Sequence, residues 1–329
     1  MNIRLIAFTD RGFLLAQRLA ESLPGEAERC GQTHSLQSWT EAAFPNAQAL
    51  IFVGAAGIAV RAIAPYVKSK VQDPAVVVVD EKGQFAVPIL SGHLGGANDL
   101  ARKIAGLIGA CPVITTATDV NRLFAVDEWA KRQNCHVANP ECIKLVSGKL
   151  LSGKEVTVRC PWKIQGTPPE PVQPGEEMPD VNVDIYKTSQ DGLCLVPRIA
   201  VLGVGCKKGT TCEALERAYQ RLLEKYGLFS QAVCRICSID LKKEEPGLLA
   251  FAQTHGWQLE TYSAQELAAV PGAFSASGFV KSVTGVDNVC ERSALLGSGG
   301  TLIIKKNAGD GITMAVAVEP YAPDWSYNE

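Results

Sequence analysis

The sequence lacks an excess of either charge, because 32 lysines and arginines face 34 aspartates and glutamates and charged residues make up only 20% of the chain. Without a basic field, nucleic-acid binding is not indicated, and any affinity for anions must come from local clusters. The chain also lacks an apolar run of the ~18 residues that cross a membrane. Its start, Met1–Phe8, is typical of a first strand rather than a signal peptide, so we expect no membrane association and a cytoplasmic protein.

A recognisable framework of paired cysteines is lacking as well. The 11 cysteines are an odd number, and their scatter through apolar runs favours reduced thiols over disulfides. Cys234 and Cys237 have the spacing of half a zinc knuckle, but they lie in a strand-like run and have no second cysteine pair or histidine nearby. The sequence therefore predicts no metal bound by the protein itself.

What the sequence does contain is an alternation of apolar strands and helical patterns. Val76–Val79 is apolar at every position, as expected for a strand covered on both faces of a largely parallel sheet. Helices are then expected on both sides of that sheet. The predicted strands of this first part are Ile3–Phe8, Ala49–Val53, Ala75–Val79, Phe85–Ile89 and Pro112–Thr115, and its predicted helices are Arg11–Leu23, Ile58–Tyr66, Asn98–Ile108 and Phe124–Gln133.

A second α/β unit begins with the strand Ile199–Gly205 and continues with a predicted helix over Thr210–Tyr226. Its further predicted strands are Gln231–Ser238, Gln258–Tyr262, Thr301–Lys305 and Thr313–Val318. The expected fold is therefore α/β, with two doubly wound, largely parallel domains, residues 1–138 and 198–329.

The segment between the two units is rich in proline. Six of the 18 prolines fall in Pro161–Asp180, and no regular element is expected to survive that density. Short alternating stretches on either side favour a small strand-rich insert over a tethered linker for Asn139–Pro197. The two domains are thus expected to be joined by a Pro-rich, partly strand-forming middle segment, residues 139–197.

Four glycine-rich turns carry the chemical signal, and the first follows the predicted strand Ala49–Val53. Gly54, Ala55 and Gly57 lie where this strand gives way to a helix, so backbone N–H groups can face a carboxylate or phosphate there. Arg61, one turn into the helix, can close on the same anion. We favour this anion-binding interpretation over glycines that only permit tight packing.

The second turn presents His93 at a strand end, which is where open α/β sheets bind ligands. His93 can act as a general acid or base, donate to an anion, ligate a metal carried by the substrate, or serve the structure. Glycines on both sides argue against simple core packing, whereas Asn98 or Asp99 is expected to cap the next helix. The other predicted substrate-binding residues of this turn are Ser91, Gly92, Gly95 and Gly96.

The third turn brings hydroxyls and a carboxylate to another strand end, with Thr115, Thr116 and Asp119 after a short apolar run. A functional role and a role as turn and cap residues are equally supported. Asp127 and Glu128 follow on a predicted helix. Because adjacent residues point about 100° apart on a helix, we do not expect them to act as a pair on one face.

The fourth turn contains Lys207, Lys208 and Thr210 at the mouth of the second unit. Lys208 precedes Gly209, which reverses the order in the Walker phosphate loop, so nucleotide binding is not indicated. A glycine turn, two ammonium groups and a helix N-terminus nevertheless favour contact with a carboxylate or phosphate.

Taken together, these segments resemble a known family, the cobalt-precorrin-5A hydrolases (CbiG) of the anaerobic cobalamin pathway. The resemblance covers nearly the whole chain except Asn139–Pro197. It rests on Gly54–Arg61, Asp73–Asp80, Ser91–Asn98, Val113–Asp119 and Phe124–Asp127 in the first domain, and on Gly203–Thr210 and Val286–Ala294 in the last. One departure is Ala56, at a position that we associate with threonine in the family.

The resemblance implies a hydrolase that opens the lactone between the ring A acetate and C20 of a cobalt tetrapyrrole. The two-carbon C20 unit then leaves as acetaldehyde and cobalt-precorrin-5B remains. Cobalt is carried by the substrate, and the protein is expected to have no cofactor of its own. A substrate with many carboxylates around an apolar macrocycle needs several separate anion sites. We expect it between the domains, held by Gly54–Gly57, Arg61 and Lys207–Thr210.

For the chemistry, His93 is the predicted base that deprotonates water, since an imidazole pKa of about 6.5 suits that task. The N–H groups of Gly95 and Gly96 are the predicted oxyanion donors, and Asp119 is the candidate that delivers a proton to the macrocycle. Ligation of the substrate's cobalt by His93 is the opposing interpretation. The alternative function is a non-catalytic binding or carrier protein for an anionic tetrapyrrole, and neighbouring corrin-pathway enzymes are candidate partners.

Overall fold

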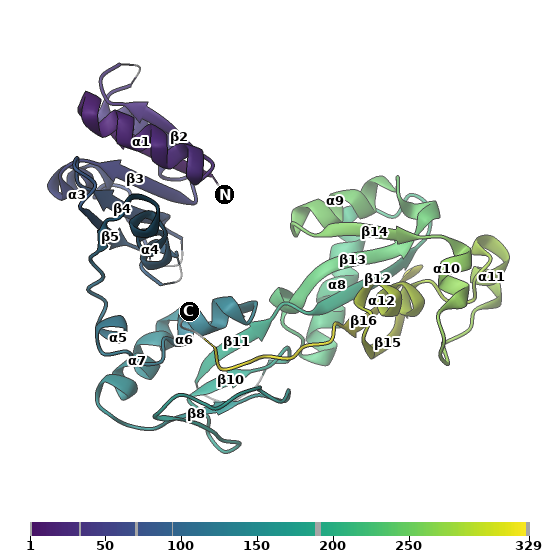
Figure 1. The fold of residues 1–329 in the computed structure, drawn as a ribbon. Helices are drawn as coiled ribbons and strands as arrows, with labels where there is room; N and C mark the ends of the chain where they lie inside the picture. The colour runs from purple at the N-terminus through teal and green to yellow at the C-terminus, as the bar shows by residue number, and fades with distance from the viewer. Residues whose placement is uncertain (1, 33, 70–71, 94, 188–191, 327–329) are drawn as a thin grey trace. The chain divides into compact units, whose positions relative to one another are not determined.

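The structure is a computed structural model that describes residues 2–32, 34–69, 72–93, 95–187 and 192–326. The chain forms two compact units, residues 1–129 with 147–154 and residues 130–146 with 155–329. Three mixed, mostly parallel sheets flanked by helices carry the fold (Figure 1). The expected α/β class with largely parallel sheets is therefore confirmed.

The first unit is built on a six-stranded sheet with the order β2-β1-β3-β4-β5-β6. Strands β1 to β4 run parallel, β5 runs antiparallel to β4, and β6 runs parallel to β5. The elements up to residue 132 are β1 (Ile3–Ala7), α1 (Asp10–Ser22), β2 (Gly25–Arg29), α2 (Leu36–Ala43), β3 (Ala49–Val53), α3 (Ala56–Ile63), β4 (Ala75–Val79), β5 (Phe85–Leu90), α4 (Ala97–Ile108), β6 (Cys111–Pro112), α5 (Ala117–Val120) and α6 (Val126–Arg132).

Both faces of this sheet are covered by helices, as the all-apolar run in β4 predicts. Along β3, Ile51 and Val53 belong to the apolar layer under α1 and α4. The intervening Leu50 and Phe52 belong to the layer under α2 and α3. Successive side chains on a strand point to opposite faces, so one apolar strand contributes to two cores.

Sequence reasoning missed β2 and α2. Strand β2 reads Gly-Glu-Ala-Glu-Arg and has no apolar run, because it is an edge strand. Ion pairs hold it to β1, with Arg4 contacting both Glu26 and Glu28. Trp39 of α2 also donates its indole N–H to Glu28 at 3.0 Å. These contacts depend on residues distant in the sequence, which periodicity does not reveal.

The middle segment carries a five-stranded sheet with the order β7-β11-β10-β8-β9. The expectation that Pro161–Asp180 holds no regular element is wrong, because β9 pairs in parallel with β8. As the edge strand, β9 tolerates proline, since one side of it needs no backbone donors. The elements here are β7 (Cys135–Val137), η1 (Pro140–Cys142), α7 (Ile143–Leu151), β8 (Val156–Arg159), β9 (Val172–Pro174), β10 (Val181–Val183) and β11 (Leu193–Pro197).

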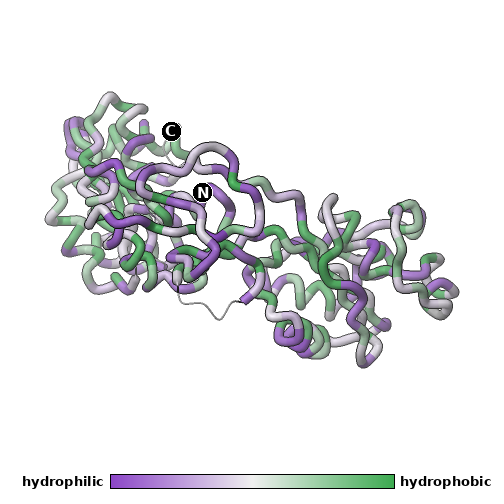
Figure 2. Tube along the Cα trace, turned by 90° about the horizontal axis from the view of Figure 1, so that it is seen from below, coloured by the Kyte–Doolittle hydropathy of each residue, from purple (hydrophilic) through white to green (hydrophobic). Residues whose placement is uncertain are grey.

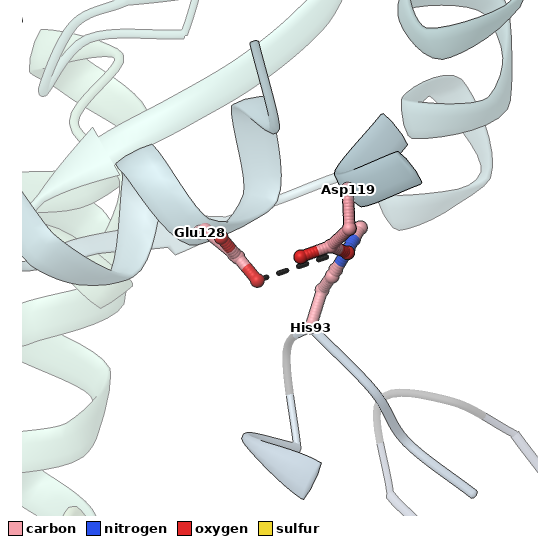
Figure 3. A group of neighbouring side chains, drawn as sticks. All are labelled: His93, Asp119 and Glu128. Atoms are coloured by element: carbon pink, nitrogen blue, oxygen red, sulfur yellow. Dashed lines mark hydrogen bonds and ion pairs between the residues drawn. The ribbon is translucent and has the colours of Figure 1, made fainter. Parts of the chain in front are cut away.

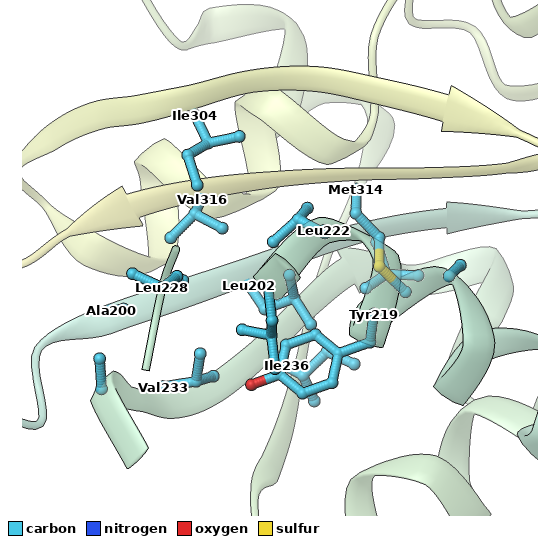
Figure 4. Packing of buried hydrophobic residues seen from close by; sticks show 14 of the residues in the cluster. Ala200, Leu202, Tyr219, Leu222, Leu228, Val233, Ile236, Ile304, Met314 and Val316 are labelled. Carbon is cyan, nitrogen blue, oxygen red and sulfur yellow. The ribbon is translucent and has the colours of Figure 1, made fainter. Parts of the chain in front are cut away.

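The C-terminal sheet has the order β14-β13-β12-β16-β15. Leu202 of β12 and Ile236 of β13 pack with Tyr219 and Leu222 of α8 in one buried core (Figure 4). The elements are β12 (Ala200–Cys206), α8 (Cys212–Tyr226), η2 (Ser230–Ala232), β13 (Val233–Ile239), η3 (Asp240–Lys242), α9 (Pro246–Thr254), β14 (Gln258–Tyr262), α10 (Ala264–Ala269), α11 (Gly278–Thr284), α12 (Cys290–Ser298), β15 (Thr301–Gly309) and β16 (Ile312–Val318).

Apolar and polar residues change over short distances along the trace, as Figure 2 shows by colour. Within the described ranges, none of the helices is both long and apolar enough to cross a membrane. All 11 cysteines are free thiols, and Cys237 of the pair Cys234–Cys237 is buried in β13.

The packing of α12 on β12 generates a stability prediction. A Cβ at Gly203 would lie 1.9 Å from the carbonyl oxygen of Cys290, so Gly203→Ala must push the helix backbone away. We expect the free energy of unfolding to fall by about 1–3 kcal/mol, measured by denaturant titration. Gly278→Ala is the control, because a Cβ there meets no atom within 4 Å. An unchanged unfolding midpoint for Gly203→Ala would contradict this packing.

Candidate functional site

The His93 turn lies at the edge of the first sheet where the parallel strands begin. Strand β5 ends there because it runs antiparallel to β4, with Leu90 paired to Val76. Ser91 then donates its hydroxyl to the carbonyl of Asp73, just before β4, at 3.0 Å. The strand end that presents His93 is therefore not at the carboxyl edge of the parallel strands, where open α/β sheets bind ligands.

The turn after β3 lies at the opposite edge. Gly54 follows the last residue of β3 and donates its N–H to Val79, the last residue of β4, at 2.8 Å. A strand of five residues spans roughly 17 Å, so the length of the sheet separates this turn from His93. The structure does not bring Gly54, Ala55, Gly57 and Arg61 together with His93.

The turn after β6 does meet His93. Strand β6 runs parallel to β5, so the chain leaves both strands toward the same edge. The Nε2 atom of His93 lies 2.8 Å from Oδ2 of Asp119 and 3.4 Å from the Thr118 hydroxyl. Thr116 accepts a hydrogen bond from the Asn98 side chain at 3.1 Å, whereas Thr115 is exposed. His93 and Asp119, the two predicted catalytic residues, are thus in direct contact.

Two further carboxylates contact the imidazole. Oδ1 of Asp127 lies 3.2 Å from Nδ1, and Oε1 of Glu128 lies 3.7 Å from Nε2. Figure 3 shows Glu128 pointing from α6 toward His93 and Asp119. The side chains of the four residues are 6–12% exposed. We call His93, Asp119, Asp127 and Glu128 the His93 cluster.

Sequence reasoning missed Asp127 and Glu128. It noted that adjacent residues on α6 point in different directions, and the two carboxylates do not share a face. That divergence lets them approach different nitrogens of one ring, which only the fold reveals. The available signal was the segment Phe124–Asp127, which belongs to the family resemblance.

Asp119 is itself held by two donors on α4. The Asn98 side-chain amide donates to Oδ2 at 3.1 Å, and the Arg102 guanidinium donates to Oδ1. The prediction that Asn98 or Asp99 caps α4 is wrong, since Gly96 is the N-cap residue and no side chain caps it. Asn98 is 1% exposed and lies in the first turn of α4, where it orients Asp119.

The carboxylates outweigh the effect of burial on the imidazole. Burial alone would lower the pKa of His93, but the hydrogen bond to Asp127 and its charge, the hydrogen bond to Asp119 and the charge of Glu128 raise it to about 9. Burial is the largest cause that raises the pKa of Glu128, and the charge of His93 partly opposes it. The pKa of about 6.5 assumed for a histidine base therefore does not describe His93 in the fold.

The glycines of the His93 turn serve packing and turn closure. A Cβ at Gly95 would lie 2.3 Å from the Ser91 Cβ, and one at Gly92 would lie 2.9 Å from the Asn98 side-chain oxygen. The Gly96 N–H donates to the carbonyl of His93 at 2.8 Å. Gly96 is therefore not a free oxyanion donor, contrary to expectation.

The first and fourth turns, which are also predicted to bind anions, differ in which of their donors remain free for a substrate. Arg61 is exposed and has no ion pair with any residue of the described ranges. In the fourth turn, Lys207 and Lys208 are exposed, but the Gly209 N–H already donates to the Glu245 carboxylate at 2.7 Å. The Thr210 hydroxyl donates to the carbonyl of Lys207 at 2.8 Å. A substrate carboxylate would thus meet the two lysines rather than these donors.

Comparison with known families accounts for most of the chain. Models described as Cobalamin synthesis G N-terminal, Cobalamin biosynthesis central region and Cobalamin synthesis G C-terminus match residues 38–119, 124–201 and 200–317. The chain belongs to the CbiG family. The N-terminal model includes His93 and Asp119, and the central model includes Asp127 and Glu128, so the His93 cluster draws on two parts of this CbiG protein.

Curated relatives agree with this membership. The cobalt-precorrin-5A hydrolase of Salmonella typhimurium is 35% identical, with 96% of this chain and 97% of the relative covered. The cobalt-precorrin-5A hydrolase of Priestia megaterium is 33% identical, with 84% of this chain and 80% of the relative covered. A crystal structure of a cobalamin biosynthesis protein G homolog from Sulfolobus solfataricus is 24% identical, covers 97% of each chain and has a TM-score of 0.43.

The environment of His93 predicts how stability depends on pH. The folded pKa of about 9 lies above the unfolded value, so the stabilisation is fully present below pH 6.5 and is lost as the pH rises through about 9. We expect wild type to lose more unfolding free energy over this interval than His93→Gln does, in denaturant titrations. NMR of the imidazole measures the pKa directly, and a value at or below 6.5 would contradict the prediction.

Proposed function

We propose that this CbiG protein hydrolyses the ring A acetate to C20 lactone of cobalt-precorrin-5A, releasing acetaldehyde and giving cobalt-precorrin-5B, and that the His93 cluster is its catalytic centre. The names of two relatives at 33–35% identity support the reaction. The observation that carries the site is the convergence of three carboxylates on one imidazole that is only 12% exposed. Such a set of ionisable groups, drawn from three segments, is typical of acid–base chemistry.

The reaction requires the His93 cluster to accept one proton and to donate another. Water attacks the lactone carbonyl, loses a proton, and the ester bond to the C20 oxygen breaks. The C20 oxygen then becomes the carbonyl of acetaldehyde as the bond from C20 to the macrocycle breaks, and the macrocycle takes a proton. Glu128 is placed to accept from water, because its Oε1 has no hydrogen-bond donor among the described residues. Asp119, bonded to His93, remains the candidate for the second transfer.

The substrate brings its own cobalt and several carboxylates. Arg61 and the exposed pair Lys207 and Lys208 remain proposed carboxylate contacts, each worth roughly 1.5–3 kcal/mol if charge-assisted. Because Arg61 lies at the sheet edge opposite to His93, it would bind a part of the substrate remote from the reacting lactone. A cytoplasmic location and contact with neighbouring corrin-pathway enzymes also remain proposals from the sequence.

The His93 cluster generates a prediction about turnover. We expect His93→Ala and Glu128→Gln each to lower kcat by about 10²–10⁴-fold, the usual contribution of acid–base assistance. The measurement is single-turnover release of acetaldehyde from the cobalt-containing lactone under anaerobic conditions. Glu216→Gln is the matched control, because the Glu216 carboxylate pairs with His255 and has no contact with the His93 cluster.

Each outcome separates the interpretations. A fall in rate with unchanged substrate binding supports the catalytic centre. A changed visible spectrum of the bound substrate in His93→Ala would instead indicate that His93 ligates its cobalt. Wild-type protein that binds the lactone but releases acetaldehyde only at the uncatalysed rate would favour the carrier function. Variants that lose thermal stability yet keep wild-type turnover would exclude the His93 cluster as the catalytic centre.

A further inference from the structure

The inner face of the His93 cluster has the donor set of a cation site. Nε2 of His93 and one carboxylate oxygen each from Asp119 and Glu128 all lie within 4.8 Å of one another. Two ligands about 2.1 Å from one metal, at angles near 90–110°, are roughly 3.0–3.4 Å apart. The separations of 2.8 Å from Nε2 to Asp119 and 3.7 Å from Nε2 to Glu128 bracket that range.

The most telling atom is Oε1 of Glu128. This oxygen is buried and has no hydrogen-bond partner within the described ranges. The Glu128 side chain is only 9% exposed and points into the His93 cluster. Nε2 of His93, 3.7 Å away, offers this oxygen charge but no hydrogen bond, and a buried carboxylate oxygen without a donor is costly. A cation between His93, Asp119 and Glu128 would satisfy it.

The surrounding contacts orient the ligands as metal sites require. Asp127 contacts Nδ1, which leaves Nε2 as the coordinating nitrogen. A carboxylate on the far nitrogen of a histidine ligand is a common feature of such sites and fixes the ring. Asn98 and Arg102 hold Asp119 in the same way.

The charge balance points to a divalent ion. Asp119, Asp127 and Glu128 carry three negative charges when ionised, and Arg102, which Asp119 shares with the exposed Asp99, offsets at most one of them. With His93 neutral, as a ligand must be, at least two negative charges remain. One divalent cation neutralises them, which matters because all three carboxylates are largely buried.

The cobalt of the substrate does not fit this donor set. A macrocycle already supplies the ligands in its plane and leaves an axial position for one protein atom, whereas three atoms converge here. Imidazole together with carboxylates suits a free first-row ion such as Zn²⁺ or Mn²⁺.

We infer that His93, Asp119 and Glu128 bind a free divalent cation, with Asp127 as the residue that orients His93. The sequence alone predicts no metal, because the three ligands lie on separate segments without a ligand spacing. Binding does not depend on the proposed function. In the cation-loaded protein Nε2 of His93 and Oε1 of Glu128 are both ligands, so the proton acceptance from water that we propose for Glu128 belongs to the cation-free protein.

The test uses the full chain after treatment with a chelator, with Zn²⁺ followed by calorimetry and Mn²⁺ by loss of its free-ion EPR signal. We expect one ion per chain. His93→Ala should abolish binding, and Glu128→Gln, which is nearly isosteric, should weaken it more than about tenfold. Asp127→Asn, which keeps all three ligands, should weaken it by about 10–100-fold, as loss of an orienting partner does.

Glu216→Gln is the matched control, because Glu216 pairs with His255 at 2.7 Å and also accepts from the Gln220 side chain, away from the His93 cluster. Its binding should equal that of wild type. Thermal melting confirms that each variant is folded, and Glu128→Gln carries the test if His93→Ala does not fold. No stoichiometric binding of either ion, or equal binding by wild type and Glu128→Gln, would overturn the inference. Chelator-treated protein that turns over substrate without binding either ion would overturn it while leaving the proposed function intact.

Discussion

The reversal of β5 is the constraint on which the candidate site depends. The Asp80 carboxylate accepts three backbone N–H groups, from Lys82, Gln84 and Phe85, at 2.6–2.9 Å. This tight turn after β4 makes β5 antiparallel, because a short connection cannot cross over to place the next strand in parallel. The chain consequently reaches His93 at the edge where the parallel strands begin. Because β6 follows β5 in parallel, Asp119 arrives at the same edge.

The charges around His93 then determine which chemistry is possible at this edge of the sheet. A largely buried imidazole beside three carboxylates is stabilised in its protonated form, and each carboxylate in turn needs a positive or donating neighbour. Asp119 has Asn98 and Arg102 as donors, but Glu128 has none beyond a 3.7 Å approach to Nε2. Glu128 is therefore the carboxylate of the site that still lacks a donor. A proton from water or a cation would be accommodated there.

Much of the fold could be predicted from the sequence, because apolar runs report burial. Val76–Val79 predicted a doubly covered strand, and His93 and Asp119 were each noticed as polar residues on turns at strand ends. The direction of β5 could not be predicted, since it depends on the hairpin at Asp80. Strand β2 is held by Arg4 and has no apolar run of its own. Asp127 and Glu128 escaped because their convergence depends on how α6 packs, which no spacing encodes.

The four glycine turns look alike as sequence and differ in what their donors already bind. Gly54 and Gly96 give their N–H groups to carbonyls, and Gly209 gives its N–H to Glu245. Buried backbone donors are nearly always satisfied internally, so a glycine-rich turn exposes free N–H groups only when nothing nearby can accept from them. Ligand binding near such turns therefore depends on side chains that keep an unsatisfied polar atom. Glu128 meets that condition best, although it lies outside all four turns.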